Sequence, residues 1–443
     1  MKKIIALLLA VVMVFALVAC ASTAKTEEKT DAPAPAETTN EETTAPAEET
    51  DAPAEEETAE PAGDAVGTDI KIGVVLIGDE NEGYTYSHIK GIQEAAKALG
   101  ISESNIIWKY SIPEDESCYD ACVDCVDQGC QIVITNSYGH QSFCLLAAEE
   151  YPDVQFVAMT GDTARANGLA NFHNAFTGIY QARYVGGVVA GMKLQQLIDE
   201  GKVEDKNKTA DGKIKIGYVG AYPYAEVVSG YTAFFLGLQS IVPDVAMQVQ
   251  YTNSWFNITA ENEAAKALIA DGCIIVSQHA DSMGAPTACE VAGVPNVSYN
   301  GSTVAACPNT FIVSSRINWE PYFEYILNCM MNGEDIALDW TGTIATGSVE
   351  LSAINEQAAA AGTAEKLEEV KAALAAGTIK VFDTATFTVN GEALTSYLAD
   401  VDDMGDFVGD TEVVIDGEFK ESFFRAAPYF DLNIDGITLP EGM

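Results

Sequence analysis

The chain has 443 residues, of which 66 are Asp or Glu and 23 are Lys or Arg, so its formal net charge at pH 7 is −43. A charge this negative repels phosphate backbones and argues against a nucleic-acid-binding protein. Hydrophobic residues make up 48% of the chain, which excludes a wholly disordered protein and allows two or three folded domains.

Residues 1–19 have the pattern of an export signal, in which Lys2 and Lys3 are followed by an apolar run over residues 4–19. That run is shorter than the roughly 20 residues that a membrane-spanning helix needs. It ends at Leu17-Val18-Ala19-Cys20, which resembles the lipobox of bacterial lipoproteins and implies that Cys20 is acylated and begins the mature chain. An ordinary secretory signal, cut elsewhere, is the alternative. We expect a protein held by lipid at the extracytoplasmic face of the cell membrane.

Residues 20–68 follow as a lipidated cysteine and an acidic tether. From Ala21 to Thr68 there are 14 acidic residues against Lys25 and Lys29, with five prolines and no aromatic residue. A segment of this composition buries too little apolar surface to offset the entropy of ordering it. We expect a disordered tether; an acidic tail that binds a partner is the alternative.

The pattern changes at residue 69, where strands begin to alternate with helices. Residues 70–77 form a run rich in β-branched residues, which predicts a buried strand. The segments that follow predict helices at 88–99, 117–128 and 141–151, strands at 105–110, 130–135 and 154–159, and a long helix at 176–197. Strands that alternate with helices of this length favour βαβ units around a parallel sheet.

The same alternation restarts at residue 213, where KIKIG echoes the DIKIG of residues 69–73. The second series predicts strands at 213–220, 246–251, 273–277 and 296–299, and helices at 227–240, 260–270 and 283–292. Two α/β lobes in tandem place a cleft between the carboxyl ends of their sheets, where open α/β sheets bind ligands. We assign 69–180 to lobe 1, with a returning segment near 310–335, and 181–309 to lobe 2, with part of 336–443.

Sequence motifs for catalysis and for nucleotide cofactors are absent. No G-x-G-x-x-G follows either opening strand, and the chain has no G-x-x-x-x-G-K-[ST], G-x-S-x-G or H-E-x-x-H. His88, His140, His173 and His279 are too scattered to form a metal-binding motif. We therefore expect a binding protein rather than an enzyme, with no cofactor and no metal.

Three cysteines share one face of a predicted helix. Cys118, Cys122 and Cys125 fall at positions i, i+4 and i+7 of the helix expected at 117–128. This spacing is that of a buried stripe, in which free cysteine behaves as a small apolar residue. A disulfide or a thiolate metal site is the alternative, although three thiolates spread over two turns reach a single ion only with distortion.

Seven short motifs, in order along the chain, resemble one family of bacterial lipoproteins. They are EGYTYSHIKG (82–91), YPDVQF (151–156), YQARYVGG (180–187), SWFN (254–257), QHADS (278–282), INWEPY (317–322), and ESFFRAAPYF (421–430) followed by IDGI (434–437). Together they resemble the basic membrane protein family of ABC-transporter substrate-binding lipoproteins, the relatives of purine nucleoside receptors. The resemblance extends over residues 69–443.

The resemblance implies a type I periplasmic-binding fold: two Rossmann-like α/β lobes with parallel sheets, joined by three hinge crossovers beside a cleft. It implies that the cleft closes on a purine nucleoside or a purine base. It also implies two partners, a membrane permease and a cytoplasmic ATPase. A ligand-sensing receptor of the same fold, in a signalling system, is the alternative function.

A purine has two flat faces and a polar edge, so its cleft needs aromatic walls and a few directed polar groups. By the resemblance, Tyr84 stands where the family has Trp and would stack on the ligand from lobe 1, unless it only packs in its loop. Trp255 follows a strand of lobe 2 and would face the ligand from the other side, or pack in the core. Trp319 would either wall the cleft or pack at the hinge.

The polar candidates also follow predicted strands. Asp281 could accept a hydrogen bond from a ribose hydroxyl or a purine N–H, or could cap the helix expected at 283–292. By the resemblance, Asn300 stands where nucleoside-binding relatives have Asp, which argues against ribose recognition and towards a free base or a different edge pattern. His279 is expected behind the site. The remaining candidates are Asp79 and Asn81, which could instead only form their turn, together with Ser137, Tyr138 and Asn318.

Overall fold

The computed structural model describes residues 67–401 and 408–440. The signal peptide expected at 1–19, the acylated Cys20 and most of the tether expected at 20–68 lie outside the described residues. Among the helices that are described, none is long and apolar enough to span a membrane.

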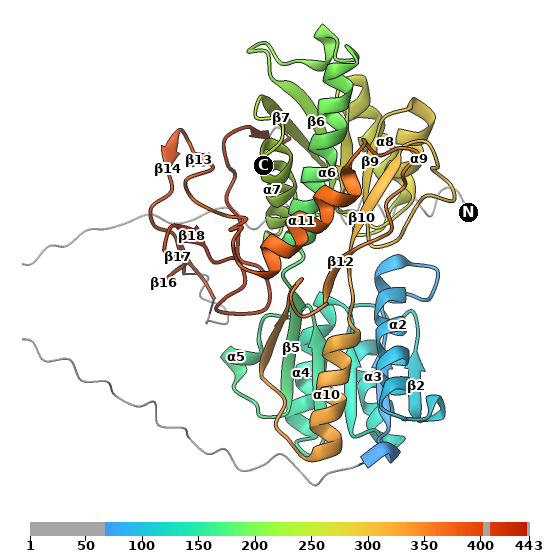
Figure 1. Cartoon of the computed structure of the whole chain (residues 1–443). Coiled ribbons are helices and arrows are strands. Elements are labelled where there is room, and N and C mark those ends of the chain that lie inside the picture. The colour runs from blue at the N-terminus through green and yellow to red at the C-terminus, as the bar shows by residue number, and fades with distance from the viewer. Residues whose placement is uncertain (1–66, 402–407, 441–443) are drawn as a thin grey trace, which may run out of the picture. The chain divides into compact units, whose positions relative to one another are not determined.

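Lobe 1 is built around a six-stranded sheet whose neighbouring strands all run parallel, in the order β11-β5-β4-β3-β1-β2 (Figure 1). Helices α2 (Gly83–Ala98) and α10 (Glu320–Asn332) cover one face, and α3 (Glu116–Asp127) and α4 (Gln141–Glu150) cover the other. The strands are β1 (Ile72–Val75), β2 (Ile106–Lys109), β3 (Ile132–Thr135), β4 (Gln155–Met159), β5 (Phe172–Thr177) and β11 (Asp339–Gly342), and the short helix α5 (Ala164–Asn167) precedes β5.

Lobe 2 is built around a seven-stranded sheet in the order β12-β10-β9-β8-β6-β7-β19, in which only β12 runs antiparallel to its neighbour. Helices α6 (Tyr180–Asp199), α7 (Ala225–Gln239) and α11 (Thr363–Ala375) cover one face, and α8 (Ile258–Ala270) and α9 (Gly284–Ala292) cover the other. The strands are β6 (Ile214–Gly220), β7 (Val245–Tyr251), β8 (Val276–Gln278), β9 (Asn296–Tyr299), β10 (Phe311–Ile317), β12 (Val349–Leu351) and β19 (Ile437–Thr438).

Close helix packing in lobe 2 depends on two glycines. Helices α6 and α7 approach so closely that a Cβ at Gly187 would lie 2.0 Å from the carbonyl oxygen of Phe234. A Cβ at Gly237 would lie 2.1 Å from the carbonyl oxygen of Tyr184. No side chain larger than hydrogen fits either position, which explains two of the glycines in these helices.

Buried cysteines fill one side of lobe 1. Cys118, Cys122 and Cys125 are fully buried between α3 and the sheet, as the core interpretation predicts. All nine cysteines of the described residues are buried and free of disulfides. Hydrogen bonds with the Cys118 and Cys144 thiols raise the pKa of Cys122, and burial raises it further, so the neutral thiol is favoured.

The described chain passes between the lobes at three places: between β5 and α6, between β10 and α10, and between β11 and β12 (Figure 1). Strand β10 therefore belongs to the sheet of lobe 2, and the part returned to lobe 1 runs from α10 to β11, later in the chain than the expected 310–335. Each crossing is a short connection, so the lobes are linked but separately folded around their own sheets.

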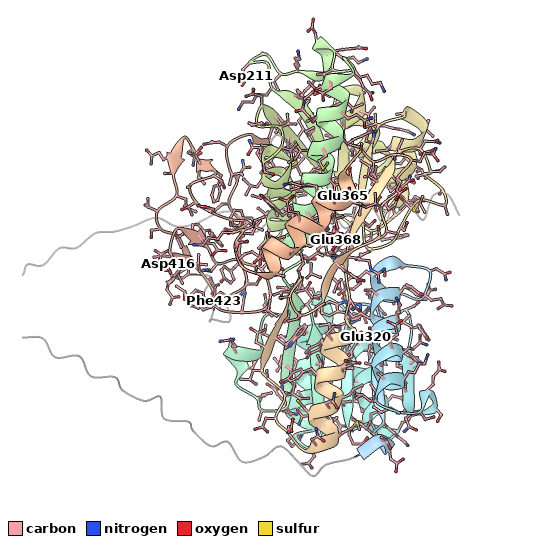
Figure 2. The ribbon with its side chains drawn as sticks, viewed as in Figure 1. Asp211, Glu320, Glu365, Glu368, Asp416 and Phe423 are labelled. Atoms are coloured by element: carbon pink, nitrogen blue, oxygen red, sulfur yellow. The ribbon has the colours of Figure 1, made fainter. Side chains whose placement is uncertain are left out.

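The C-terminal segment after α11 contacts both lobes. It forms three small hairpins, β13 (Thr388–Val389) with β14 (Glu392–Ala393), β15 (Leu398–Ala399) with β16 (Thr411–Glu412), and β17 (Val414–Ile415) with β18 (Glu418–Phe419). The Glu421 carboxylate then accepts a hydrogen bond from the Ser229 hydroxyl of α7 (2.5 Å), and the Ala426 N–H donates to the Asp339 carboxylate of β11 (2.9 Å). Phe423, between these two anchors, is 67% exposed (Figure 2).

Two expected boundaries are wrong for identifiable reasons. The helix expected at 88–99 begins at Gly83, because the Glu82 carboxylate accepts hydrogen bonds from the N–H groups of Tyr84 and Thr85 and caps the helix. The helix expected at 176–197 begins at Tyr180, because the residues before it form β5 in the middle of the lobe 1 sheet. That strand was not predicted from the sequence.

Candidate functional site

A cavity of about 480 Å³ lies between the carboxyl ends of the two sheets. From lobe 1 it is lined by residues that follow β1 to β4, and from lobe 2 by residues that follow β6, β7 and β8 and by Tyr299, the last residue of β9. Its size is within the range of small-molecule sites, which is about 300–1,000 Å³. Seven of the ten residues predicted for the ligand site line it: Asp79, Asn81, Tyr84, Ser137, Tyr138, Trp255 and Asp281.

Tyr84 forms an aromatic wall on the lobe 1 side. It lies in the first turn of α2 rather than in the preceding loop. Its hydroxyl donates to the carbonyl oxygen of Asn136 and lies 3.4 Å from the Thr160 hydroxyl, while its ring packs edge-on against His88 with the ring centres 4.7 Å apart. These contacts fix the plane of the ring towards the cavity.

The other lobe 1 candidates are held by local hydrogen bonds. The Asp79 carboxylate accepts from the backbone N–H (2.9 Å) and side-chain amide (3.0 Å) of Asn81, so the pair both forms the turn and lines the cavity. The Ser137 hydroxyl donates to the Glu114 carboxylate at 2.7 Å. The Tyr138 hydroxyl donates to Asp162 at 3.1 Å, and its ring is 46% exposed at the cavity's edge.

Trp255 belongs to an aromatic cluster on the lobe 2 side. Its ring meets Tyr222 edge-on at 5.1 Å, and Tyr222 is stacked on Tyr224 with ring centres 5.1 Å apart. Phe256, the next residue, also lines the cavity and is 53% exposed. An apolar surface of this kind beside an open cavity favours a flat ligand.

Asp281 and Asn300 form a pair on lobe 2. The Asn300 side-chain amide donates to the Asp281 carboxylate at 2.7 Å, and only Asp281 lines the main cavity. Burial raises the pKa of Asp281 well above its usual value, the nearby Glu82 and Glu226 carboxylates raise it further, and the bond from Asn300 opposes them. Asn300 was predicted to contact the ligand, but the structure places its side chain on the carboxylate, where it orients Asp281.

Two predicted site residues lie elsewhere. Trp319 has no exposed surface and packs in the core of lobe 1, with its ring 4.9 Å from that of His88. The prediction of a ligand wall is therefore wrong for Trp319, because the crossover after β10 turns it towards α2 rather than the cleft. Asn318 lines a separate cavity of about 310 Å³, and its side chain contacts Gly347 (3.2 Å) and the Glu320 N–H (3.3 Å) at the start of α10.

Several lining residues were not predicted. They are Ile77, Gly78, Glu82, Ser111, Glu114, Thr160, Glu226, Phe256 and Tyr299, together with His279, which was expected only behind the site. Four of them, Ser111, Glu114, Thr160 and Glu226, follow β2, β4 or β6, and Tyr299 is the last residue of β9. The rule that ligands bind at the carboxyl ends of strands, applied to every strand, would have found these five.

Backbone strain is concentrated around the cavity. Ser111 and Thr160 line it with φ angles of 55° and 61°, and Asn300 beside it has a φ of 58°. A positive φ is costly for a residue other than glycine, most of all for β-branched Thr. Such strain persists where surrounding contacts fix the conformation, and it clusters at binding sites.

The cavity is strongly acidic. Asp79, Glu82, Glu114, Glu226 and Asp281 line it, and no Lys or Arg is among its lining residues. Carboxylates accept hydrogen bonds, so this lining selects ligands that donate. Within residues 67–401 and 408–440, no group of His, Cys, Asp or Glu has the arrangement of a metal site.

Comparison with known proteins agrees with this geometry. Residues 70–381 match the family described as ABC transporter substrate-binding protein PnrA-like. The chain belongs to this family. Its members are solute-binding proteins rather than enzymes, and substrate-binding proteins of ABC transporters work outside the cytoplasm. The family resemblance seen in the sequence is thus confirmed over residues 70–381.

Individual relatives add detail. A purine-binding protein of Brucella abortus is 29% identical over 255 residues, covering 57% of this chain and 67% of that protein. A protein of Haloferax volcanii named as an ABC transporter glucose-binding protein is 27% identical over 293 residues, covering 66% and 68%. A solute-binding protein of an ABC transporter system from Conexibacter woesei superimposes with a TM-score of 0.55 at 19% identity, covering 70% of this chain and 97% of that chain, which confirms the type I periplasmic-binding fold.

Proposed function

We propose that this family member binds a purine base or purine nucleoside between its two lobes and presents it to the permease and ATPase of an ABC importer. We also propose that Cys20 carries the lipid that anchors the protein at the extracytoplasmic face of the membrane. Membrane fractionation of a Cys20→Ser variant checks the anchor: the variant should appear in the soluble fraction, and unchanged membrane attachment would contradict it.

The observation that carries the ligand proposal is the pair of aromatic walls. Tyr84 of lobe 1 and Trp255 of lobe 2 line the same cavity. Two rings from opposite lobes suit a flat heteroaromatic ligand, whose stacking with each ring adds to the burial of its faces. The 29% identical relative from Brucella abortus, named as purine-binding, supports the same ligand class.

The acidic lining defines the polar part of the ligand. Purine N–H groups and ribose hydroxyls donate hydrogen bonds, which Asp281 and Glu226 are placed to accept. A phosphate group would meet the five carboxylates of the cavity without a basic side chain to pair with. The proposed ligand is therefore unphosphorylated.

Binding is coupled to closure of the lobes. A ligand that touches both Tyr84 and Trp255 gains contacts only when the lobes approach, so it shifts the population towards the closed state. The three crossovers are the connections about which the lobes can rotate. A permease can then distinguish the closed, ligand-bound protein from the open, empty protein.

A thermal-unfolding panel tests the ligand class. The protein from residue 21 onward, partly unfolded and refolded to remove any bound ligand, would be tested with adenosine, guanosine, adenine, uridine, glucose, an amino acid and adenosine monophosphate. A ligand at 100 times its dissociation constant stabilises the folded state by about 2.7 kcal/mol, which raises Tm by a few degrees. We expect this shift with a purine nucleoside or base and none with the monophosphate. A shift with glucose alone, or with no purine, would overturn the proposal.

A further inference from the structure

A buried arginine lies directly behind the lobe 2 wall of the cleft. Arg183, near the start of α6, is 2% exposed, and its guanidinium carbon lies 3.7 Å from the centre of the Tyr299 ring. The same Tyr299 lines the cavity, and its ring is 4.9 Å from that of His279, which also lines it. The order from core to cavity is therefore guanidinium, then Tyr299 and His279, then ligand space.

Arg183 is not explained as an ordinary structural ion pair. Its Nη1 donates to the carbonyl oxygen of Gln278 at 2.6 Å, whereas its Nε and Nη2 are buried and have no hydrogen-bond partner among the described residues. No carboxylate in the described residues lies within ion-pair distance of it. A buried charge without a nearby carboxylate destabilises the folded state. The presence of Arg183 here therefore indicates a role in the adjacent cavity.

The carboxylates of the cleft supply the missing compensation at longer range. Burial is the main reason for the raised pKa of Tyr299; the Arg183 charge then lowers it, and the Glu226 and Asp281 carboxylates raise it. All three charged groups thus act on one ring. Because the interior dielectric is low, a positive charge behind the ring stabilises negative charge in front of it.

We propose that Arg183 is a positioning residue for ligand binding: its guanidinium holds the Tyr299 ring against the cleft, and its charge offsets the negative charge of the carboxylates that line the cavity. This inference rests on the function proposed above. A cation stacked on the rear face of an aromatic wall also draws electron density from the ring, which strengthens its stacking on an electron-rich heterocycle.

The state of His279 follows from the same arrangement. Burial lowers the pKa of His279, the Arg183 charge lowers it further, and the Glu226 carboxylate opposes both. Its Nε2 lies 3.2 Å from the Glu226 carboxylate, so a neutral His279 donates from Nε2 and orients that carboxylate. Glu82, which caps α2, and Glu261 of α8 act on Asp281, and Tyr218 of β6 acts on Tyr299. The Glu226 carboxylate also acts on Tyr84 of α2 and on Glu421 of the C-terminal segment.

Calorimetric titration of adenosine and adenine at pH 5 to 8 tests the proposal. Arg183→Met removes the charge and the planar group, Arg183→Lys keeps the charge, and Lys193→Met removes one positive charge from the same helix away from the cleft. We expect Arg183→Met to weaken binding about tenfold at pH 7 and to move the loss of affinity at low pH towards higher pH. Arg183→Lys should keep the wild-type pH profile with lower affinity, and Lys193→Met should change neither.

A second measurement needs no ligand and separates this inference from the proposed function. Histidine proton resonances would be followed against pH in the wild type, Arg183→Lys and Arg183→Met, with His279→Gln to assign the signal among the four histidines. Loss of the Arg183 charge should raise the pKa of His279, and Lys should restore it. If the wild type binds neither probe, the purine proposal fails while this test still decides the placement of the charge.

The contradicting results are equally definite. Arg183→Met that binds adenosine or adenine with the affinity and pH profile of the wild type, even if its Tm is lower, would show a structural role alone. An unchanged His279 pKa in Arg183→Met would show that the guanidinium charge does not act on the cleft. If Arg183→Met does not fold, Arg183→Lys carries the test, because a shifted pH profile with the charge retained would overturn the proposal.

Discussion

At the scale of single residues, burial raises the pKa of two carboxylates, Asp281 and Glu421, that make specific contacts. Asp281 faces the cavity and is held by Asn300, whereas Glu421 is 2% exposed between the Ser229 and Ser422 hydroxyls, which both donate to it. Burial raises the pKa of Glu421 to about 7, the two serine hydroxyls lower it, and the Glu226 carboxylate adds to the rise. Asp281 is the group proposed to contact the ligand, and Glu421 joins the C-terminal segment to α7.

The raised pKa of Glu421 predicts how stability depends on pH. The folded pKa of about 7 lies above the ordinary value near 4.5, so between these pH values the native state holds a proton that the unfolded chain has lost. Stability therefore falls as pH rises through this window, by about 3 kcal/mol in total, and is then constant. Glu421→Gln should remove this fall. The free energy of unfolding of the variant, relative to that of the wild type, should therefore be higher at pH 8 than at pH 5.

Urea unfolding at the two pH values measures this difference. Glu365→Gln, on the exposed face of α11, is the matched control and should follow the wild type (Figure 2). Equal effects of Glu421→Gln at pH 5 and pH 8 would show that Glu421 has an ordinary pKa in the folded protein.

Residue types and their place after a strand located much of the cleft. Tyr84 could be predicted from the family resemblance, and Trp255 and Asp281 because they follow apolar strands at the edge where open α/β sheets bind ligands. Trp319 could not be placed, because the direction of a side chain after a crossover depends on which lobe the chain enters next. The hydrogen bond from Asn300 to Asp281 joins the segments that follow β9 and β8, and local patterns do not predict a contact between two separate segments.

At the scale of elements, the alternation of strands and helices could be predicted from the sequence. The strands that distant parts of the chain add to each sheet could not. Every strand of lobe 1 up to β4 was predicted, whereas β5 was missed because FHNAFT carries polar residues that are buried only by its neighbours β4 and β11. Parallel addition of β11 to lobe 1 and of β19 to lobe 2 joins segments far apart in the chain. Such pairings are set by the edges left open by each sheet, which local periodicity does not encode.

At the scale of the whole molecule, two separately folded lobes share one acidic, aromatic cavity. Like the whole chain, whose net charge is −43, the cavity has an excess of acidic groups. Five carboxylates line it, and the Arg183 charge lies behind the Tyr299 ring. The family match ends at residue 381, and the segment beyond it joins α7 of one lobe to β11 of the other. In the proposed function, binding depends on how the lobes approach each other and not on either lobe alone.

The central claim is that a single purine-like ligand is held between Tyr84 and Trp255. Calorimetric titration of Tyr84→Ala, Trp255→Ala and the control Trp108→Ala, whose ring stacks on Tyr110 outside the cavity, tests it most directly. We expect each cleft variant to lose about tenfold to a hundredfold in affinity, because one stacking face is removed, while Trp108→Ala binds as the wild type does. Wild-type affinity in either cleft variant would show that the ligand is not held between the two lobes.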